Sequence, residues 1–261
     1  MIWRLQIAQQ VTGGTLAQPR HKSKSIVVWP LSGGPAAPEQ PCAWAHRAMA
    51  PSMRRFVVIG RQATASADFS LDDLPGSSGR LDVLLRCVRA ALLVSHGLRR
   101  DVVVYLVLLG GQQAPRVVRF DGALAKFVRP DERSLATLVK KVLAAAGDAS
   151  TPAHGFVEVK AGIAISRGGL ADVIADLGQA TAYILDENGP DVRDSRELGR
   201  GDIAFFVGDH GGFDDATRAC LVAIGARSIR VGPVSLHAED AVAIVSNEID
   251  RTVIALALPC S

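Results

Sequence analysis

The chain has 261 residues, of which 48% are hydrophobic and 21% charged, with a formal net charge of +3, a balance typical of globular proteins. No apolar run reaches the roughly 20 residues of a membrane-spanning helix, and the four cysteines stand far apart without a Cys-x-x-Cys pair. The composition therefore argues against a membrane protein, a disulfide framework and a metal centre, and we expect a cytoplasmic protein with free thiols.

The first 52 residues differ from the rest of the chain. They hold all three tryptophans, six of the thirteen prolines and five basic side chains against one acidic, which leaves 24 basic and 25 acidic side chains elsewhere. The prolines from Pro30 to Pro41 cannot continue a helix or a central strand. We expect residues 1–52 to be a loosely ordered N-terminal extension, or upstream sequence before a true start at Met53. Because the remainder is nearly neutral, RNA binding would need a local basic patch.

From residue 54 onward, apolar runs of strand length alternate with segments of helical periodicity. In chain order we expect strands at 54–60, 102–109, 116–120, 181–185, 203–207 and 228–231, and helices at 80–95, 131–146, 170–177, 214–224 and 238–251, with a turn-rich joint at 147–152. This alternation predicts an α/β fold in which helices flank a mainly parallel sheet. The domain would span residues 53–252, followed by a short tail at 253–261.

Turns rich in glycine and charge follow three consecutive predicted strands, which end at Leu185, Val207 and Val231. Because the carboxyl ends of parallel strands gather at one edge of a sheet, these turns are candidates for a ligand site. Glycines there let the backbone approach a ligand closely, and Asp209 and His210 could orient it. The alternative is that glycines after strands only form turns.

A second candidate site begins with Gly76-Ser77-Ser78-Gly79, which reads as a flexible loop entering a helix. Arg80, Asp82 and Arg86 follow in the first two turns, and a helix start with arginines suits a phosphate. The alternative is structural: Asp82 and Arg86 stand four residues apart and can form a helix salt bridge, with Ser78 as a cap.

The run Arg99-Arg100-Asp101 precedes the buried strand at 102–109 and could either bind RNA or tie down a loop. His96 lies nearby without metal-ligating neighbours, so a packed polar residue is the simpler interpretation. Neither a Gly-x-Gly-x-x-Gly fingerprint nor a Gly-Lys-Ser/Thr phosphate loop is present. From composition and spacing alone, the inference ends at an α/β protein with a ligand-binding edge.

Several of these sequence segments, in the same order, resemble characteristic motifs of one family, the archaeal-type tRNA pseudouridine-54 N1-methyltransferases of the SPOUT (α/β-knot) class. In the N-terminal half they are Leu74-Pro75-Gly76-Ser77-Ser78-Gly79-Arg80-Leu81-Asp82, Ser95-His96-Gly97-Leu98-Arg99-Arg100-Asp101 and Pro130-Asp131-Glu132-Arg133. In the C-terminal half they are Tyr183-Ile184-Leu185, Gly208-Asp209-His210-Gly211 and Ile229-Arg230-Val231-Gly232-Pro233-Val234-Ser235-Leu236-His237-Ala238. The resemblance covers roughly residues 54–251.

The resemblance implies a deep trefoil knot in the C-terminal part that holds S-adenosylmethionine (SAM) mainly through backbone groups. Carried over by position, the cofactor contacts fall on Leu185, Gly208, Val231, Gly232, Pro233, Val234, Ser235 and Leu236. A later position that is often cysteine in the family is Ala241 here, which would weaken any side-chain contact made there.

The resemblance also implies a homodimeric, SAM-dependent enzyme that methylates N1 of pseudouridine 54 in tRNA without a metal. We assign candidate catalytic roles to Arg80, Asp82 and Asp101, and candidate RNA contacts to Arg86, Arg99 and Arg100. Alternatives are methylation of pseudouridine in another RNA, such as ribosomal RNA, and a non-catalytic RNA-binding assembly factor with the same fold.

Overall fold

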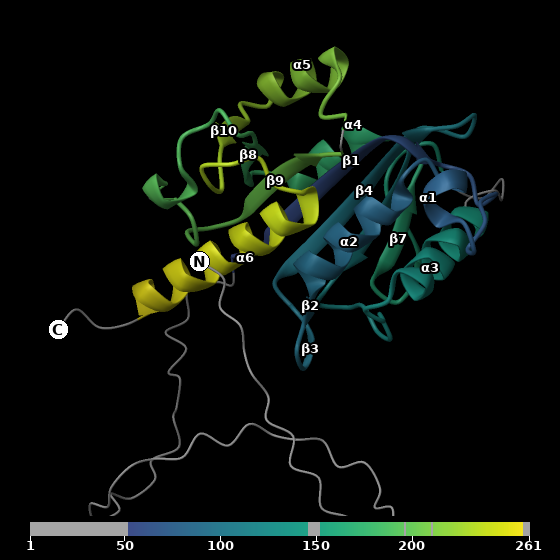
Figure 1. The fold of residues 1–261 in the computed structure, drawn as a ribbon, viewed down its shortest axis with the longest axis horizontal. Helices are drawn as coiled ribbons and strands as arrows, with labels where there is room; N and C mark the ends of the chain where they lie inside the picture. The colour runs from purple at the N-terminus through teal and green to yellow at the C-terminus, as the bar shows by residue number, and fades with distance from the viewer. Residues whose placement is uncertain (1–51, 146–151, 196, 210, 258–261) are drawn as a thin grey trace, which may run out of the picture. The chain divides into compact units, whose positions relative to one another are not determined.

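An eight-stranded sheet forms the centre of the protein in the computed structural model, which describes residues 52–145, 152–195, 197–209 and 211–257 (Figure 1). The strand order is β10(Arg227–Ile229), β8(Thr181–Leu185), β9(Ile203–Gly208), β1(Arg54–Thr64), β4(Val102–Gly110), β5(Arg116–Asp121), β7(Ile163–Ser166) and β6(Val157–Lys160). The predicted N-terminal extension lies outside the described residues except for Ser52, and the predicted joint at 147–152 lies outside them except for Pro152.

The sheet has a parallel and an antiparallel part. β10, β8, β9, β1 and β4 pair in parallel, whereas β5, β7 and β6 continue the sheet from β4 in antiparallel pairs. The predicted α/β class with a largely parallel sheet is confirmed, but the hairpin of β6 and β7 was not predicted. β6 is mostly exposed and carries no apolar run, so it gives a weak strand signal.

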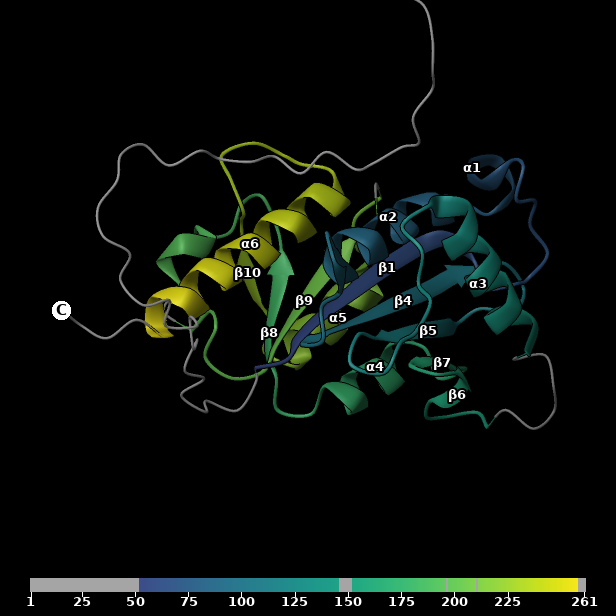
Figure 2. The ribbon, with the colours of Figure 1, turned by 90° about the horizontal axis from the view of Figure 1, so that it is seen from below.

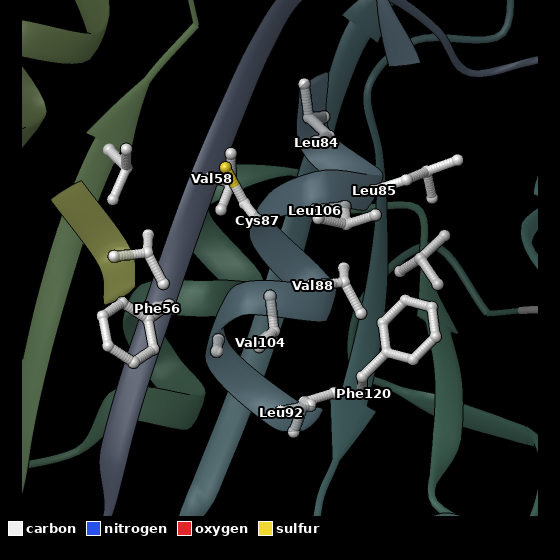
Figure 3. Packing of buried hydrophobic residues seen from close by; sticks show 14 of the residues in the cluster. Phe56, Val58, Leu84, Leu85, Cys87, Val88, Leu92, Val104, Leu106 and Phe120 are labelled. Atoms are coloured by element: carbon white, nitrogen blue, oxygen red, sulfur yellow. The ribbon is translucent and has the colours of Figure 1, made fainter. Parts of the chain in front are cut away.

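Helices cover both faces of the sheet. α2(Leu81–Leu92), α3(Glu132–Ala145) and α6(Ala238–Ala257) pack on the face formed by Phe56 and Val58 of β1, as Figures 2 and 3 show. α4(Leu170–Leu177) and α5(Asp215–Ala223) pack on the opposite face with Val57 and Ile59. Since successive side chains of a strand point to opposite faces, the uninterrupted apolar run of β1 serves both cores.

Most elements differ from their predicted bounds by one or two residues, β1 continues four residues further to Thr64, and other differences are larger. The helix predicted at 80–95 ends at Leu92, and the chain continues into a small hairpin of β2(Leu93–Val94) and β3(Gly97–Leu98). The expected flexible loop contains a short helix, α1(Leu74–Ser77). β10 ends two residues before the predicted 231, and α6 continues to Ala257, so the predicted tail is wrong up to that residue. In the described segments, no helix combines the length and apolar character that crossing a bilayer demands.

A cluster of ion pairs fixes α6 to the amino-terminal edge of β1 and β4. The buried guanidinium of Arg54 lies 2.9 Å from Asp101 and 2.6 Å from Asp250 of α6, and Arg99 lies 2.7 Å from the other oxygen of Asp250. Burial alone would raise the pKa of Asp250, but the hydrogen bonds and charges of Arg99 and Arg54 hold it below its usual value. Asp250 is therefore ionised over the neutral range and anchors the helix.

We expect this anchor to fail at acid pH. A carboxylate whose folded pKa lies below its unfolded value of about 3.9 stabilises the fold above that value, and the contribution is lost as pH falls through the folded pKa. Asp250→Asn should therefore lower the free energy of unfolding at pH 7 and weaken its fall below about pH 4. Urea unfolding between pH 7 and pH 3 measures both, with the exposed Asp215→Asn on α5 as control. Parallel curves for wild type and Asp250→Asn would contradict the assignment.

Candidate functional site at the carboxyl edge of the sheet

The turns after β8, β9 and β10 enclose a cavity of about 390 Å³ at the carboxyl edge of the parallel strands. This volume lies within the range of small-molecule sites. Seven of the eight predicted cofactor contacts line the cavity, and only Pro233 does not; the seven are Leu185, Gly208, Val231, Gly232, Val234, Ser235 and Leu236. Its wall also contains residues that were not predicted as contacts, among them Asp186, Glu187, Phe213, Arg218 and Arg230.

Ala241, on the first turns of α6, lines the same cavity and is nearly buried. The small residues of the lining are Gly208, Gly212, Gly232, Ser235 and Ala241, and the glycines among them let a ligand approach the main chain closely. No group of three or more histidine, cysteine or acidic side chains among the described residues is placed to hold a metal ion.

Asp209 braces the cavity from the end of β9. Its carboxylate accepts a hydrogen bond from the backbone N–H of Arg61 at 2.8 Å and another from that of Gly211 at 2.8 Å. These bonds tie the turn after β9 to the end of β1, so Asp209 shapes the cavity wall. His210, the other residue expected to orient a ligand, lies outside the described residues.

The segment after β8 wraps closely around β10. Arg230 donates its N–H to the carbonyl of Pro190 at 2.9 Å, and Val192 donates to the carbonyl of Arg230 at 2.8 Å. At Gly189 an added Cβ would lie 2.6 Å from the backbone nitrogen of Ile229, so only glycine fits this crossing. The loop at 186–192 therefore packs tightly against β10 and Arg230, directly before the 231–236 turn.

The N-terminal candidate site is a rigid structure at the same sheet edge. The buried hydroxyl of Ser78 donates to the carbonyl of Leu74 at 2.5 Å and accepts from the N–H of Leu81 at 3.2 Å. The carbonyl of Ser78 accepts from the N–H of Thr64 on β1. Gly79 and Arg80 both have positive φ, 62° and 68°, so the chain reverses sharply before α2.

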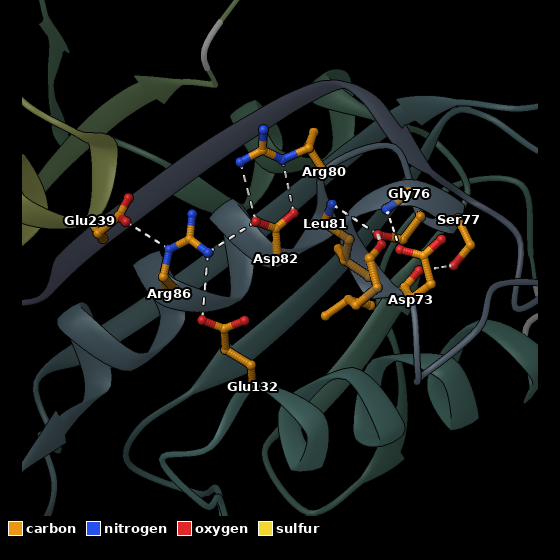
Figure 4. A network of polar contacts seen from close by, with 11 residues as sticks. Asp73, Gly76, Ser77, Arg80, Leu81, Asp82, Arg86, Glu132 and Glu239 are labelled. Atoms are coloured by element: carbon orange, nitrogen blue, oxygen red, sulfur yellow. Dashed lines mark hydrogen bonds and ion pairs between the residues drawn. The ribbon is translucent and has the colours of Figure 1, made fainter.

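An ion network follows this reversal and reaches α6 (Figure 4). Asp82, only 3% exposed, binds the Arg80 Nε at 3.1 Å and the Arg86 Nη1 at 3.0 Å. Arg86 also binds Glu239 of α6 at 2.7 Å and lies 3.5 Å from Glu132 of α3. The predicted salt bridge between Asp82 and Arg86 is therefore present, but Glu239 and Glu132 were missed because no sequence spacing links them to it.

The network keeps Asp82 ionised. Burial alone would raise its pKa, but the hydrogen bonds from Arg80 and Arg86 outweigh burial and hold the pKa below its usual value. An ionised carboxylate with both oxygens engaged by arginines is a weak proton acceptor at neutral pH and a strong orienting group. In this arrangement Asp82 fixes the guanidinium of Arg80, which is half-exposed at the sheet edge.

The network and the cavity adjoin each other through two elements. On α6, Glu239 belongs to the network and Ala241 to the cavity wall. On β1, Arg61 is bonded to Asp209 of the cavity, and the next residue, Gln62, contacts the backbone at Gly79. The two candidate sites therefore form one continuous edge.

The third predicted group, Arg99-Arg100-Asp101, lies at the opposite edge of the sheet. It precedes β4, whose nine residues span roughly 25–30 Å at about 3.3 Å each. Asp101 pairs with Arg54, Arg99 with Asp250, and Arg100 donates to the carbonyls of Gly122 and Ala123. Within one chain, the structure does not bring Asp101 to Arg80 and Asp82.

Comparisons with known proteins agree with this geometry. The model of a family described as "Putative SAM-dependent RNA methyltransferase" matches residues 53–254. A protein of Methanosarcina acetivorans named tRNA (pseudouridine(54)-N(1))-methyltransferase is 40% identical over 200 residues, which cover 76% of this chain and 92% of that protein. Its namesakes from Methanosarcina mazei, 42% identical over 204 residues, and Halobacterium salinarum, 41% over 200, cover the same share of this chain and 92% and 96% of their own lengths.

Among solved structures, Archaeoglobus fulgidus Nep1 bound to S-adenosylhomocysteine is similar in fold. The TM-score is 0.53 at 17% sequence identity, and the match covers 78% of this chain and 99% of that one.

Proposed function

Because the chain belongs to this family of SAM-dependent RNA methyltransferases, we propose that it transfers the methyl group of SAM to N1 of pseudouridine 54 in tRNA. The observation that carries the proposal is the continuous edge described above, where a cavity with three glycines in its lining adjoins an arginine held by a buried carboxylate. The cavity provides a place for a cofactor, and Arg80 provides a cation beside it.

The residues of the cavity fit SAM. Arg218 and Arg230 suit the carboxylate of the cofactor, whereas Asp186 and Glu187 suit its hydroxyl and ammonium groups. Gly208, Gly232 and Ala241 leave space and expose backbone groups. When bound, SAM supplies a methyl group made electrophilic by the neighbouring sulfonium.

The protein's part in the reaction is positioning and charge stabilisation. As N1 of pseudouridine accepts the methyl group, the bond between that methyl and the sulfur of SAM breaks and the N1 proton passes to solvent water. Negative charge that develops on the base spreads to the uracil carbonyls. Arg80 stabilises that charge, and Asp82 orients Arg80. The low pKa of Asp82 favours this orienting role over proton acceptance.

The finer features of the resemblance remain parts of this proposal. The fitted crossing of the 186–192 loop over β10 supports a trefoil knot. A homodimer would let Asp101, Arg99 and Arg100 of a second subunit approach the first subunit's site, which they cannot do within one chain. We place the enzyme in the cytoplasm with its tRNA, with residues 53–252 as the catalytic domain and residues 1–52 as an extension outside it.

Filling the cavity should weaken cofactor binding without unfolding the protein. Ala241→Leu adds three carbons to a nearly buried position in the cavity wall, and we expect the Kd for SAM to rise at least tenfold. Isothermal titration calorimetry measures the Kd, and thermal unfolding checks the fold. Ala223→Leu, on an exposed position of α5, is the control. Unchanged affinity in Ala241→Leu would place the cofactor elsewhere.

The decisive experiment compares two transcripts of one tRNA, with pseudouridine or uridine at position 54. After incubation with SAM, mass spectrometry of the digested nucleosides should find a methyl group only on the pseudouridine transcript, at N1. No methylation of either, with SAM still bound, would mean a methyltransferase for another RNA. No SAM binding would leave an RNA-binding protein of this fold without catalysis.

A further inference from the structure

A second cavity, of about 900 Å³, is an open groove apart from the cofactor cavity. Its walls come from α2, the β2–β3 hairpin, the loop at 125–130 and the start of α6. None of the predicted cofactor contacts lines it. Arg86 and Glu239 of the ion network form one end of the lining, and Arg100, before β4, contributes to the other.

Phe127 lines this groove and is 91% exposed. Its backbone is also in the left-handed region, with φ of 58°, which is rare for a bulky residue and costs free energy. The stability of the fold therefore does not explain why a phenylalanine stands here, since its ring is not buried and its backbone is strained. An exposed aromatic face beside cations is the usual platform on which nucleic-acid bases stack.

The groove has a cationic lining. Four basic side chains, Arg86, Arg89, Arg100 and Lys126, line it with two acidic ones, Glu239 and Asp240. Glu239 is already paired with Arg86. Within the described part of the chain, the side chains of Arg89 and Lys126 form no ion pair or hydrogen bond, so their charges are free for a ligand.

The groove also joins two sites that the sheet keeps apart. Along the second half of α2, where residues 86–92 span roughly 10 Å, it leads from Arg86 beside the candidate catalytic residues towards Arg100 at the opposite edge. An extended strand lying in the groove would touch Arg86 and Arg100, two of the three predicted RNA contacts, on one chain.

We propose that this groove binds a single-stranded segment of the RNA substrate, with one base stacked on Phe127 and phosphates contacted by Arg89, Lys126 and Arg100. The inference rests on the proposed function, which supplies an RNA. A second copy of the chain fits less well, because a twofold contact here would bring the same cations face to face.

The test separates stacking from charge by measuring the Kd for the pseudouridine-54 tRNA transcript at several salt concentrations. Phe127→Ala should weaken binding about tenfold and leave the slope of log Kd against log salt unchanged, whereas Phe127→Trp should restore affinity. Arg89→Gln with Lys126→Gln should weaken binding and reduce the slope by about 0.7 for each phosphate that is no longer neutralised.

Two control variants match these changes. Leu124→Ala removes an exposed apolar side chain from the same loop without touching the groove lining, and Lys160→Gln removes an exposed cation on β6. Both should keep wild-type affinity and slope. Thermal unfolding of each variant checks that the fold is intact.

Affinity within twofold of wild type in both groove variants, together with an unchanged slope in the Arg89→Gln, Lys126→Gln variant, would overturn the proposal. A loss of affinity that coincides with dissociation of an oligomer, measured by light scattering, would overturn it in favour of a second copy in the groove. Affinity is measured separately from turnover. If the wild-type protein bound tRNA without methylating it, the proposed function would be wrong, but the groove variants would still test the proposed RNA site. Wild-type protein without affinity for tRNA would fail both.

Discussion

An Asp82→Asn variant should lose roughly a hundredfold in kcat for methyl transfer while its Kd for SAM stays within twofold of wild type. The change keeps the shape of the side chain but removes the charge that holds Arg80 at 3.1 Å and Arg86 at 3.0 Å. Arg80 would then lose its fixed orientation at the edge where the base must sit. Single-turnover methylation of the pseudouridine-54 transcript measures the effect, since it isolates the chemical step from product release.

A second aspartate pair serves as the control. Asp202 binds Arg55 at 2.8 Å at the amino-terminal edge of the sheet, so Asp202→Asn removes a comparable ion pair far from the candidate site. It should keep wild-type kcat. If Asp82→Asn, and likewise Arg80→Ala, retained full turnover and full tRNA binding, the catalytic assignment of this network would be wrong.

Gly79→Ala should destabilise the fold by about 3 kcal/mol or more and disrupt the same site. Its φ of 62° is unfavourable for any other residue, and an added Cβ would lie 1.9 Å from the carbonyl oxygen of Gln62 on β1. The two backbones are held close together, because Thr64, two residues after Gln62, donates its N–H to the carbonyl of Ser78 and pairs with Gly110 of β4. Urea unfolding measures the loss of stability, and methyl transfer by the remaining folded protein measures the displacement of Arg80.

Gly225→Ala separates the two causes. Gly225, at the end of α5, has a comparable φ of 71°, but an added Cβ there meets no atom within 4 Å. This variant should lose only about 1–2 kcal/mol, the cost of the left-handed backbone alone. Equal losses at both positions would mean that the close approach to Gln62 contributes nothing.

The sequence predicts the parallel half of the sheet well because burial on both faces produces long apolar runs. β4 is such a run, and β1, β8 and β9 follow the same rule. The antiparallel edge is harder, because an exposed strand such as β6 owes its place to pairing with β7 rather than to its own composition. Helix ends were predicted wrongly where the following residues pair in another element. Leu93, for example, lies in β2 and pairs with Leu98 of β3 instead of continuing α2.

The sequence predicts which loops form the candidate site, but it does not predict the ion pairs that join distant segments within it. The turns that line the cavity follow strand ends in chain order, so their meeting at one edge is a consequence of parallel topology. The pairing of Arg86 with Glu239, 153 residues later, depends on how α2 and α6 pack and leaves no trace in spacing. The same holds for Asp101, whose place at the far edge follows from the direction of β4.

The position of β1 at the centre of the sheet has a consequence for synthesis of the protein. One side of β1 pairs with β9, and the contact between Met53 and Asp202 joins residues 149 positions apart. At about 5–20 residues per second, a ribosome needs roughly 7–30 s to make the intervening chain. During that time the strand, whose residues 56–59 are fully buried in the finished fold, has an open edge that invites pairing with other nascent chains. Fragments that stop before β9 should therefore aggregate, and the yield of soluble protein should rise when synthesis is dilute or chaperones are abundant.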